Sequence, residues 1–236
     1  MKIKTVLFDL DGTLLPMDQD VFVKAYFGGL VKKLAPFGYD PEMLVKSIWK
    51  GTDAMVLNNG EKTNEALFWD LFASIFGEES RKDEPKFAEF YENEFQKVKN
   101  VCGFKKESAQ IIKKLKDNGI RVALATNPIF PAIATESRMR WAGLEPSDFE
   151  LYTTYENCKH SKPNPKYYED ILTQLGATPE ECLMVGNDVD DDMVAERIGM
   201  KVFLLTDDLI NKNGVDISIY PNGSFAELNK FIDENI

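Results

Sequence analysis

The stretch Leu7-Phe8-Asp9-Leu10-Asp11-Gly12-Thr13 decides the fold of this chain. Its apolar residues predict a buried parallel strand that ends in two carboxylates. Asp9 and Asp11 are two positions apart, so in extended backbone their side chains point the same way, and Gly12 allows the strand to end in a sharp turn. Because buried carboxylates need a compensating charge, the pair favours a hard cation such as Mg²⁺ over an ordinary Asp-Gly turn.

A second apolar run, residues 122–125, ends in Thr126-Asn127-Pro128. Pro128 suits the first turn of a helix, and Asn127 suits the N-cap of that helix. A loop of this kind would direct a hydroxyl, backbone N–H groups and a helix N-terminus at an anion. An ordinary helix cap without a ligand is the alternative.

Two later segments supply charges of opposite sign. Pro163 and Pro165 hold Lys162 on a stiff, extended loop, where its ammonium group could neutralise carboxylates and phosphate oxygens. The apolar run 182–185 is followed by Gly186 and then by a loop with four acids in five residues. An acidic loop directly after a buried strand predicts a metal site, whereas a solvated surface loop is the alternative.

Taken together, the four segments resemble the motifs of the haloacid dehalogenase superfamily of phosphohydrolases, in order and over most of the chain. Asp9, Asp11 and Thr13 match the family's D-x-D-x-T motif, and Thr126 matches its Ser or Thr at the end of a strand. Lys162 matches the lysine of its Lys-Pro motif, and residues 186–192 approximately match its acidic loop.

One position departs from the family pattern. The family usually has Asp directly after the glycine, where this chain has Asn187 followed by Asp188. The metal ligand is therefore either the Asn187 amide oxygen or, after a shift of the loop, the Asp188 carboxylate. Adjacent residues of a strand point in opposite directions, so only one of the two can face the metal. Position favours Asn187, which aligns with the family's Asp. Charge favours Asp188, because a hard dication binds a carboxylate better than an amide, and we expect Asp188 to be the ligand.

The resemblance implies a phosphatase mechanism. Asp9 would attack phosphorus and form an aspartyl-phosphate, while Asp11 would act as general acid and then as general base. Mg²⁺ would be held by the Asp9 carboxylate, the Asp11 main-chain carbonyl and the acidic loop, and Asp192 would orient that loop or Lys162. The residues expected to bind phosphate are Gly12, Thr13, Thr126, Asn127 and Lys162, of which Thr126 and Lys162 are also expected to be catalytic.

Strand and helix patterns alternate over much of the chain. We expect strands near 3–9, 120–126, 150–154, 182–187 and 201–205, with a short one at 217–220. A helix is expected at 106–118, ending at Gly119, with Ile111, Ile112 and Leu115 on its buried face. The alternation predicts an α/β fold with a doubly wound, Rossmann-like parallel sheet.

Residues 16–100 break this alternation, because they contain no convincing strand. The resemblance implies a helical cap of the first cap class, inserted after the first strand, between core segments 1–15 and 101–236. Such a cap closes over the site and selects the substrate. Aromatic residues recur in it at helical spacing, which predicts the core of a small bundle, an aromatic substrate box being the alternative. They include Phe22, Tyr26, Phe27, Phe68, Trp69, Phe72, Phe76, Phe87, Phe90, Tyr91 and Phe95.

Composition is that of a soluble enzyme. The 236 residues are 44% hydrophobic and carry a formal net charge of −11, which argues against a nucleic-acid partner. No apolar run reaches the ~20 residues of a membrane span. The chain enters its first strand at once, so we expect no signal peptide. The widely spaced Cys102, Cys158 and Cys182 suggest free thiols in a reducing cytoplasm.

We therefore expect a cytoplasmic enzyme that hydrolyses a small phosphorylated metabolite, a phosphate monoester, with Mg²⁺ as cofactor. Four other functions stay open on the same fold. A phosphotransferase or mutase would pass the phosphoryl group to a sugar hydroxyl, and a phosphonate hydrolase would need a cap lysine such as Lys24, Lys32, Lys46 or Lys50. A dehalogenase would need neither metal nor Asp11, and a non-catalytic regulator would turn over no ester.

Overall fold

The computed structural model describes residues 2–236 and is built around a six-stranded sheet. Neighbouring strands are parallel, in the order β3-β2-β1-β4-β5-β6. Since β1 lies between β2 and β4, the residues that follow these three strands meet at one edge of the sheet. The strands are β1 (Thr5–Phe8), β2 (Arg121–Leu124), β3 (Leu151–Tyr152), β4 (Cys182–Gly186), β5 (Lys201–Leu205) and β6 (Asn222–Gly223).

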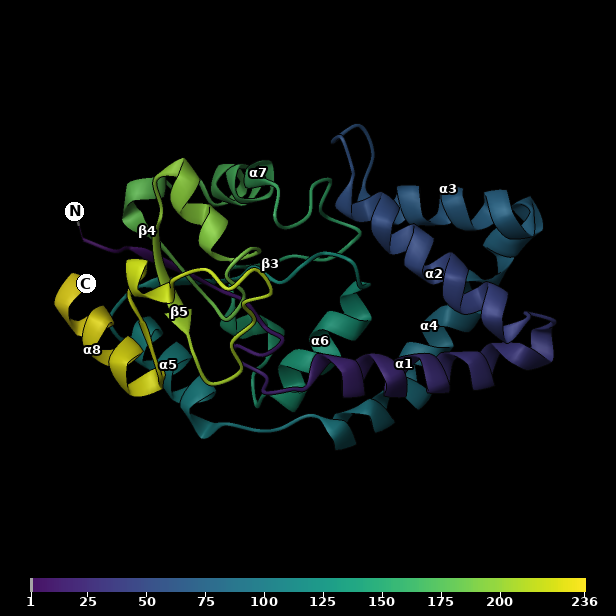
Figure 1. Cartoon of the computed structure of the whole chain (residues 1–236), viewed down its shortest axis with the longest axis horizontal. Coiled ribbons are helices and arrows are strands. Elements are labelled where there is room, and N and C mark those ends of the chain that lie inside the picture. Colours follow the sequence, from purple (N-terminus) through teal and green to yellow (C-terminus); the bar gives the residue numbers. More distant parts are fainter. Residues whose placement is uncertain (1) are drawn as a thin grey trace.

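Helices cover both faces of the sheet (Figure 1). Val6 and Phe8 of β1 belong to the hydrophobic core that includes residues of α5 (Lys106–Asp117), α6 (Ala132–Trp141) and α8 (Phe225–Asn235). Leu7 points to the opposite face and belongs to a second core with α7 (Pro165–Leu175). The predicted doubly wound α/β sheet is confirmed, and so is the buried face predicted for the helix at 106–118.

The predicted helical insertion is also observed, as a layer beyond the carboxyl ends of the strands (Figure 1). The two connections to the sheet run side by side, since Met17 and Cys102 form an antiparallel bridge and the Gly103 N–H donates to the Pro16 carbonyl at 2.7 Å. Its helices are α1 (Gln19–Leu34), α2 (Pro41–Val56), α3 (Asn64–Phe76) and α4 (Glu84–Glu92), with 3₁₀ segments at Ala35–Phe37, Glu78–Asp83 and Glu94–Val101. No helix within residues 2–236 is long and apolar enough to span a bilayer.

Most of the predicted aromatic positions are buried in this layer, for example Phe72, Phe90 and Phe95. Their rings meet mainly edge to face, as in the Phe72–Phe87 pair at 5.4 Å between centroids. The prediction that these side chains form the core of a helical bundle is confirmed. The division of the chain into a core and a separate cap domain, residues 16–100, stays a prediction.

The strand predicted at 217–220 is wrong. Residues Ile217–Ile219 form a 3₁₀ helix, and the sixth strand is the shorter Asn222–Gly223. The Asp216 side chain accepts a hydrogen bond from the Ser218 N–H at 3.0 Å, which closes the turn, and Ile219 stays exposed. β-Branched residues favoured a strand locally, but Ile217 and Tyr220 are only partly buried against the core, so no face of this segment is fully covered.

The helix predicted to begin at Pro128 is also wrong, because α6 begins at Ala132, directly after Pro131. Asn127 is therefore no N-cap. Its carbonyl instead accepts from the Ile129 N–H at 2.8 Å, which tightens the loop before the helix. The Ala132 N–H donates to the Glu156 carboxylate at 2.9 Å, so a side chain already occupies the helix N-terminus that was expected to bind an anion.

Candidate active site

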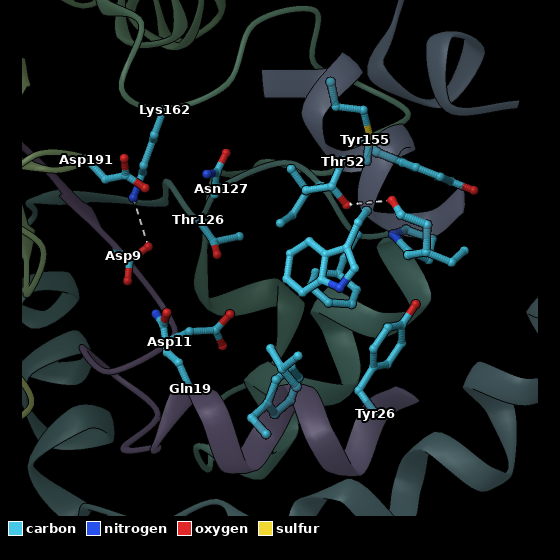
Figure 2. A pocket seen from close by; sticks show the side chains of 18 of the residues that line it. Asp9, Asp11, Gln19, Tyr26, Thr52, Thr126, Asn127, Tyr155, Lys162 and Asp191 are labelled. Carbon is cyan, nitrogen blue, oxygen red and sulfur yellow. Dashed lines mark hydrogen bonds and ion pairs between the residues drawn. The ribbon is translucent and has the colours of Figure 1, made fainter. Parts of the chain in front are cut away.

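The carboxylate of Asp9 stands at the carboxyl end of the central strand. The Asp9 N–H continues the sheet ladder by donating to the Val185 carbonyl at 2.9 Å. Its side chain is buried and accepts hydrogen bonds from Lys162 Nζ at 2.8 Å and from Thr13 Oγ1 at 3.2 Å. Figure 2 shows Asp9 and Lys162 facing each other across one end of a cavity. The structure thus brings the first and third sequence motifs into direct contact.

Lys162 is buried between two carboxylates. Its Nζ lies 2.6 Å from Asp192 Oδ1 and 2.8 Å from Asp9 Oδ1, and its side chain is only 1% exposed. Burial alone would lower the pKa of Lys162, but the charges of Asp192 and Asp9 outweigh it and hold that pKa well above its ordinary value. The predicted loop lysine therefore carries a permanent positive charge inside the site.

Gly12 and Thr13 shape the turn that follows β1. Gly12 has a φ of +83°, and a Cβ there would lie 2.3 Å from the Asn187 side chain, so only glycine fits. The Gly12 N–H donates to the Leu15 carbonyl at 2.8 Å, and Thr13 Oγ1 donates to both Asp9 and Asn187. Neither residue is among those that line the cavity. Their contacts hold neighbouring site residues in place, and their predicted role in phosphate binding stays a prediction.

Asn187 and Asp188 make different hydrogen bonds. Asn187 Nδ2 donates to the Asp208 carbonyl at 2.6 Å, which leaves Oδ1 facing Thr13, on the side of Asp9. Asp188 Oδ1 accepts from the backbone N–H groups of Asp190 and Asp191 at 2.8 and 3.0 Å. One carboxylate oxygen of Asp188 is thus used to fold its own loop, while both side chains still line the cavity.

Asp192 stabilises the acidic loop from beneath. It is fully buried, its Oδ2 accepts from the Asp188 N–H at 2.9 Å, and its Oδ1 pairs with Lys162. Asp192 therefore contacts both the acidic loop and Lys162, the two groups of which it was expected to orient one. Asp191, which the motif comparison passed over, lines the cavity, and burial raises its pKa to about 6 even though Lys162 opposes that shift.

The side chain of Asp11 meets a residue that sequence reasoning missed. Arg138 of α6 forms an ion pair with Asp11 Oδ2, lies 4.5 Å from the centroid of the Phe130 ring and is 1% exposed. Burial raises the pKa of Asp11, and the guanidinium of Arg138 opposes that shift. Asp11 Oδ1 is buried without a hydrogen-bond partner.

A sequence signal for Arg138 was available. Ala134, Arg138 and Trp141 are spaced by four and three positions, which places them on one face of a helix, and all three are buried. An arginine within an otherwise apolar stripe needs a buried counter-ion, whereas the neighbouring Arg140 is half exposed and pairs with Glu136.

Thr126 and Asn127 follow β2 and line the cavity beside Asp9 (Figure 2). The Thr126 carbonyl accepts from the Tyr167 hydroxyl at 2.8 Å and from Thr153 Oγ1 at 2.7 Å, so its backbone is fixed. Asn127 Oδ1 is buried and has no hydrogen-bond partner. This amide is thus a polar group left free beside the nucleophile candidate.

One cavity of about 280 Å³ is lined by most of these residues. Its polar end is formed by core residues, and its far end lies against the helical layer, where Tyr26 and Thr52 are found (Figure 2). The predicted site residues that line it are Asp9, Asp11, Thr126, Asn127, Lys162, Asn187, Asp188 and Asp192.

The donor set of this cavity fits Mg²⁺. Five aspartates but only two lysines, Lys162 and the exposed Lys212, line it, so negative charge is in excess. Available donors are oxygens, which a hard cation prefers. No three His, Cys, Asp or Glu side chains within residues 2–236 are close enough together to bind a metal by themselves. A site here would therefore use at most two of these side chains and complete its shell with other oxygens, such as amide or main-chain carbonyl oxygens.

Comparison with known proteins agrees with this geometry. A family model described as haloacid dehalogenase-like hydrolase matches residues 3–199. The sequence is 26% identical over 201 residues to Pyrophosphatase PpaX of Bacillus cereus (strain AH820), an alignment that covers 85% of this chain and 82% of that protein.

Solved structures share the fold over nearly the whole chain. A predicted phosphoglycolate phosphatase from Haemophilus somnus 129PT superposes with a TM-score of 0.58 at 18% identity and covers 98% of both chains. The HAD-hydrolase YfnB from Bacillus subtilis, solved with bound magnesium, gives a TM-score of 0.57 at 16% identity and covers 99% of this chain and 100% of YfnB.

Proposed function

Since the chain belongs to the haloacid dehalogenase-like hydrolases, we propose that it hydrolyses a phosphate monoester through an aspartyl-phosphate on Asp9, with Mg²⁺ as cofactor. The observation that carries this proposal is the pairing of Asp9 with the buried ammonium of Lys162 at the polar end of a cavity. A carboxylate and a cation held together at the end of a buried strand suit attack on a phosphoryl group.

In the first step, an Asp9 oxygen forms a bond to phosphorus while the bond from phosphorus to the ester oxygen breaks. The leaving oxygen takes a proton from Asp11. Burial raises the pKa of Asp11, which favours the protonated form that a general acid needs when the ester binds, while Arg138 opposes that shift. In the second step, Asp11 takes a proton from water, the water oxygen bonds to phosphorus, and Asp9 is released with inorganic phosphate.

The remaining residues hold the phosphoryl oxygens. Lys162 donates from its Nζ, and Thr126 and Asn127 donate from the loop after β2, as charge moves onto these oxygens. Arg138 acts on the reaction only through Asp11, whose orientation it holds. When bound, Mg²⁺ would reduce the repulsion between the Asp9 carboxylate and the negative phosphate.

The Mg²⁺ ligands would be the Asp9 carboxylate, the Asp11 main-chain carbonyl and Asn187 Oδ1. Thr13 Oγ1 donates to both Asp9 and Asn187, at 3.2 and 3.0 Å, so the two acceptors lie around one hydroxyl. Asp188, the ligand favoured by charge alone, has one oxygen committed to its own loop. The expectation for Asp188 is untested, and a magnesium titration described below separates the two residues.

Two alternatives lose support from the structure. A phosphonate hydrolase needs a cap lysine near the site, yet none of Lys24, Lys32, Lys46 and Lys50 lines the cavity. A dehalogenase has no use for Asp11, which here lines the cavity and is paired with Arg138. The free thiols Cys102, Cys158 and Cys182 support the cytoplasm as the location.

The test is phosphate release from a panel of small phosphate esters, with and without Mg²⁺. We expect turnover that stops in EDTA and is lost in Asp9→Asn, because a neutral amide cannot attack phosphorus. A phosphotransferase would release little phosphate until a second hydroxyl compound is added. Equal turnover by Asp9→Asn and the wild type would contradict the proposed mechanism.

A further inference from the structure

The end of the cavity away from Asp9 is apolar and carries no charge. Among residues 16–100, all of which the structure describes, the cavity is lined mainly by aromatic side chains such as Phe22, Phe68 and Trp69, and by no Lys, Arg, Asp or Glu. Both lysines that line the cavity, Lys162 and Lys212, belong to the core. A leaving group that projects from the phosphate towards the helical layer therefore meets rings and meets no cation.

Most of the few polar groups at this end are already paired. The hydroxyls of Tyr26 and Tyr91 share a hydrogen bond of 3.0 Å, and burial raises the pKa of Tyr26 to about 12, so it stays neutral. Thr52 Oγ1 donates to the Ile48 carbonyl at 3.0 Å (Figure 2). The Trp69 N–H is buried and makes no hydrogen bond of good geometry, although the Tyr155 hydroxyl lies beside it.

We infer that the substrate is a phosphate monoester of a neutral, ring-bearing alcohol whose ring packs among the aromatic side chains of the helical layer. This inference rests on the proposed phosphatase function and adds the class of leaving group. Rings stack and meet edge to face with aromatic side chains, and the Trp69 N–H, which makes no hydrogen bond of good geometry, can donate to one neutral acceptor on the ligand. The cavity volume of about 280 Å³ is near the lower limit of small-molecule sites, roughly 300 Å³.

The same surroundings disfavour an anionic leaving group. A carboxylate or a second phosphate placed among these rings would lose its hydration without gaining a counter-ion, which is costly in an apolar site. We therefore expect the chain to discriminate against phosphoglycolate and pyrophosphate.

The experiment compares esters whose leaving alcohols have similar intrinsic reactivity. The probes are 2-phenylethyl phosphate, ethyl phosphate and phosphoglycolate, assayed by phosphate release from the full chain with Mg²⁺. Burial of the ring should raise kcat/KM for the phenylethyl ester roughly 10- to 100-fold over ethyl phosphate. Phosphoglycolate should be the poorest of the three.

A pair of variants ties this preference to the cavity. Trp49 and Phe37 are both aromatic residues of the helical segment and both 46% exposed, but only Trp49 lines the cavity. Trp49→Ala should lower the ratio of kcat/KM for phenylethyl phosphate to that for ethyl phosphate by roughly threefold to tenfold. Phe37→Ala should leave the ratio unchanged. Since both side chains are half exposed, both variants should fold.

Two outcomes would overturn the inference, and they are distinguishable. If phosphoglycolate or ethyl phosphate is hydrolysed as well as the phenylethyl ester in an Asp9-dependent manner, the chain is a phosphatase but its leaving group is not apolar. If no ester releases phosphate above the level of Asp9→Asn, the proposed function fails and the inference fails with it.

Discussion

The ion pair between Arg138 and Asp11 makes a demanding prediction. Replacement of Arg138 by methionine keeps most of the side-chain volume but removes the positive charge, so the carboxylate of Asp11 loses its counter-ion. The guanidinium that lies over the Phe130 ring is replaced by a thioether, which also packs well against aromatic rings. The variant therefore tests the charge more than the packing.

The magnitude follows from burial. Removal of one partner of a buried ion pair costs about 3–5 kcal/mol, because the other charge is left uncompensated. The Asp11 side chain retains 21% exposure, so water can relieve part of this cost. We expect Arg138→Met to lower the free energy of unfolding by about 3 kcal/mol at neutral pH.

The pH dependence has a definite sign. Burial already raises the pKa of Asp11 and Arg138 opposes that shift, so loss of Arg138 should raise the pKa of Asp11 further. When a carboxyl group has a higher pKa in the folded than in the unfolded state, the folded protein loses stability as the pH rises above the pKa of the unfolded state. The stability deficit of Arg138→Met should therefore shrink as the pH is lowered towards about 5.

Urea unfolding at neutral pH and at about pH 5 measures both effects. The control is Arg140→Met in the same helix, whose side chain is 49% exposed and whose loss should cost no more than about 0.5 kcal/mol. The double variant Arg138→Met with Asp11→Asn should recover part of the lost stability, since no uncompensated charge remains. Equal stability of the Arg138→Met and Arg140→Met variants at both pH values would refute the reasoning.

Three further predictions concern the metal and the phosphate. Removal of divalent metal by EDTA should abolish turnover, and Mg²⁺ should restore it. Excess Ca²⁺ should inhibit the enzyme, because Ca²⁺ prefers a larger, looser oxygen shell. Full activity in EDTA would contradict metal dependence. Asn187→Ala should raise the Mg²⁺ concentration for half activity more than Asp188→Ala does, and the reverse order would return the ligand role to Asp188. Lys162→Met should lower kcat/KM at least about 100-fold, since it leaves Asp9 and Asp192 without their shared cation; a loss below tenfold would show that Lys162 does not act on the phosphoryl group.

Much of the fold could be predicted because its signals are local. The apolar runs before Asp9, Thr126 and Gly186 each end where a strand ends in the structure or within two residues of it. Since carboxyl ends of parallel strands share one edge of a sheet, the convergence of Asp9, Thr126 and Asn187 on one cavity followed from topology alone.

The features that sequence reasoning missed depend on tertiary contacts. Pro128 and Pro131 are equally good helix starters by local sequence. Only the helix start after Pro131 is capped, because the Glu156 carboxylate accepts a hydrogen bond from the Ala132 N–H. The aromatic residues of the helical layer have the spacing of a bundle core, and they also line the cavity because the layer covers the strand ends. The partner of Arg138 could not be predicted either, since Asp11 lies 127 positions away in the sequence.

The most direct measurement is capture of the covalent intermediate. Asp11→Asn should form the intermediate from an activated aryl phosphate and hydrolyse it slowly, because the base that activates water is absent. After an acid quench, mass spectrometry should find the mass of one added phosphoryl group on the peptide that contains Asp9, and Asp9→Asn should show none. Phosphate release by an enzyme that never carries this adduct, or an adduct on another residue, would contradict Asp9 as the nucleophile.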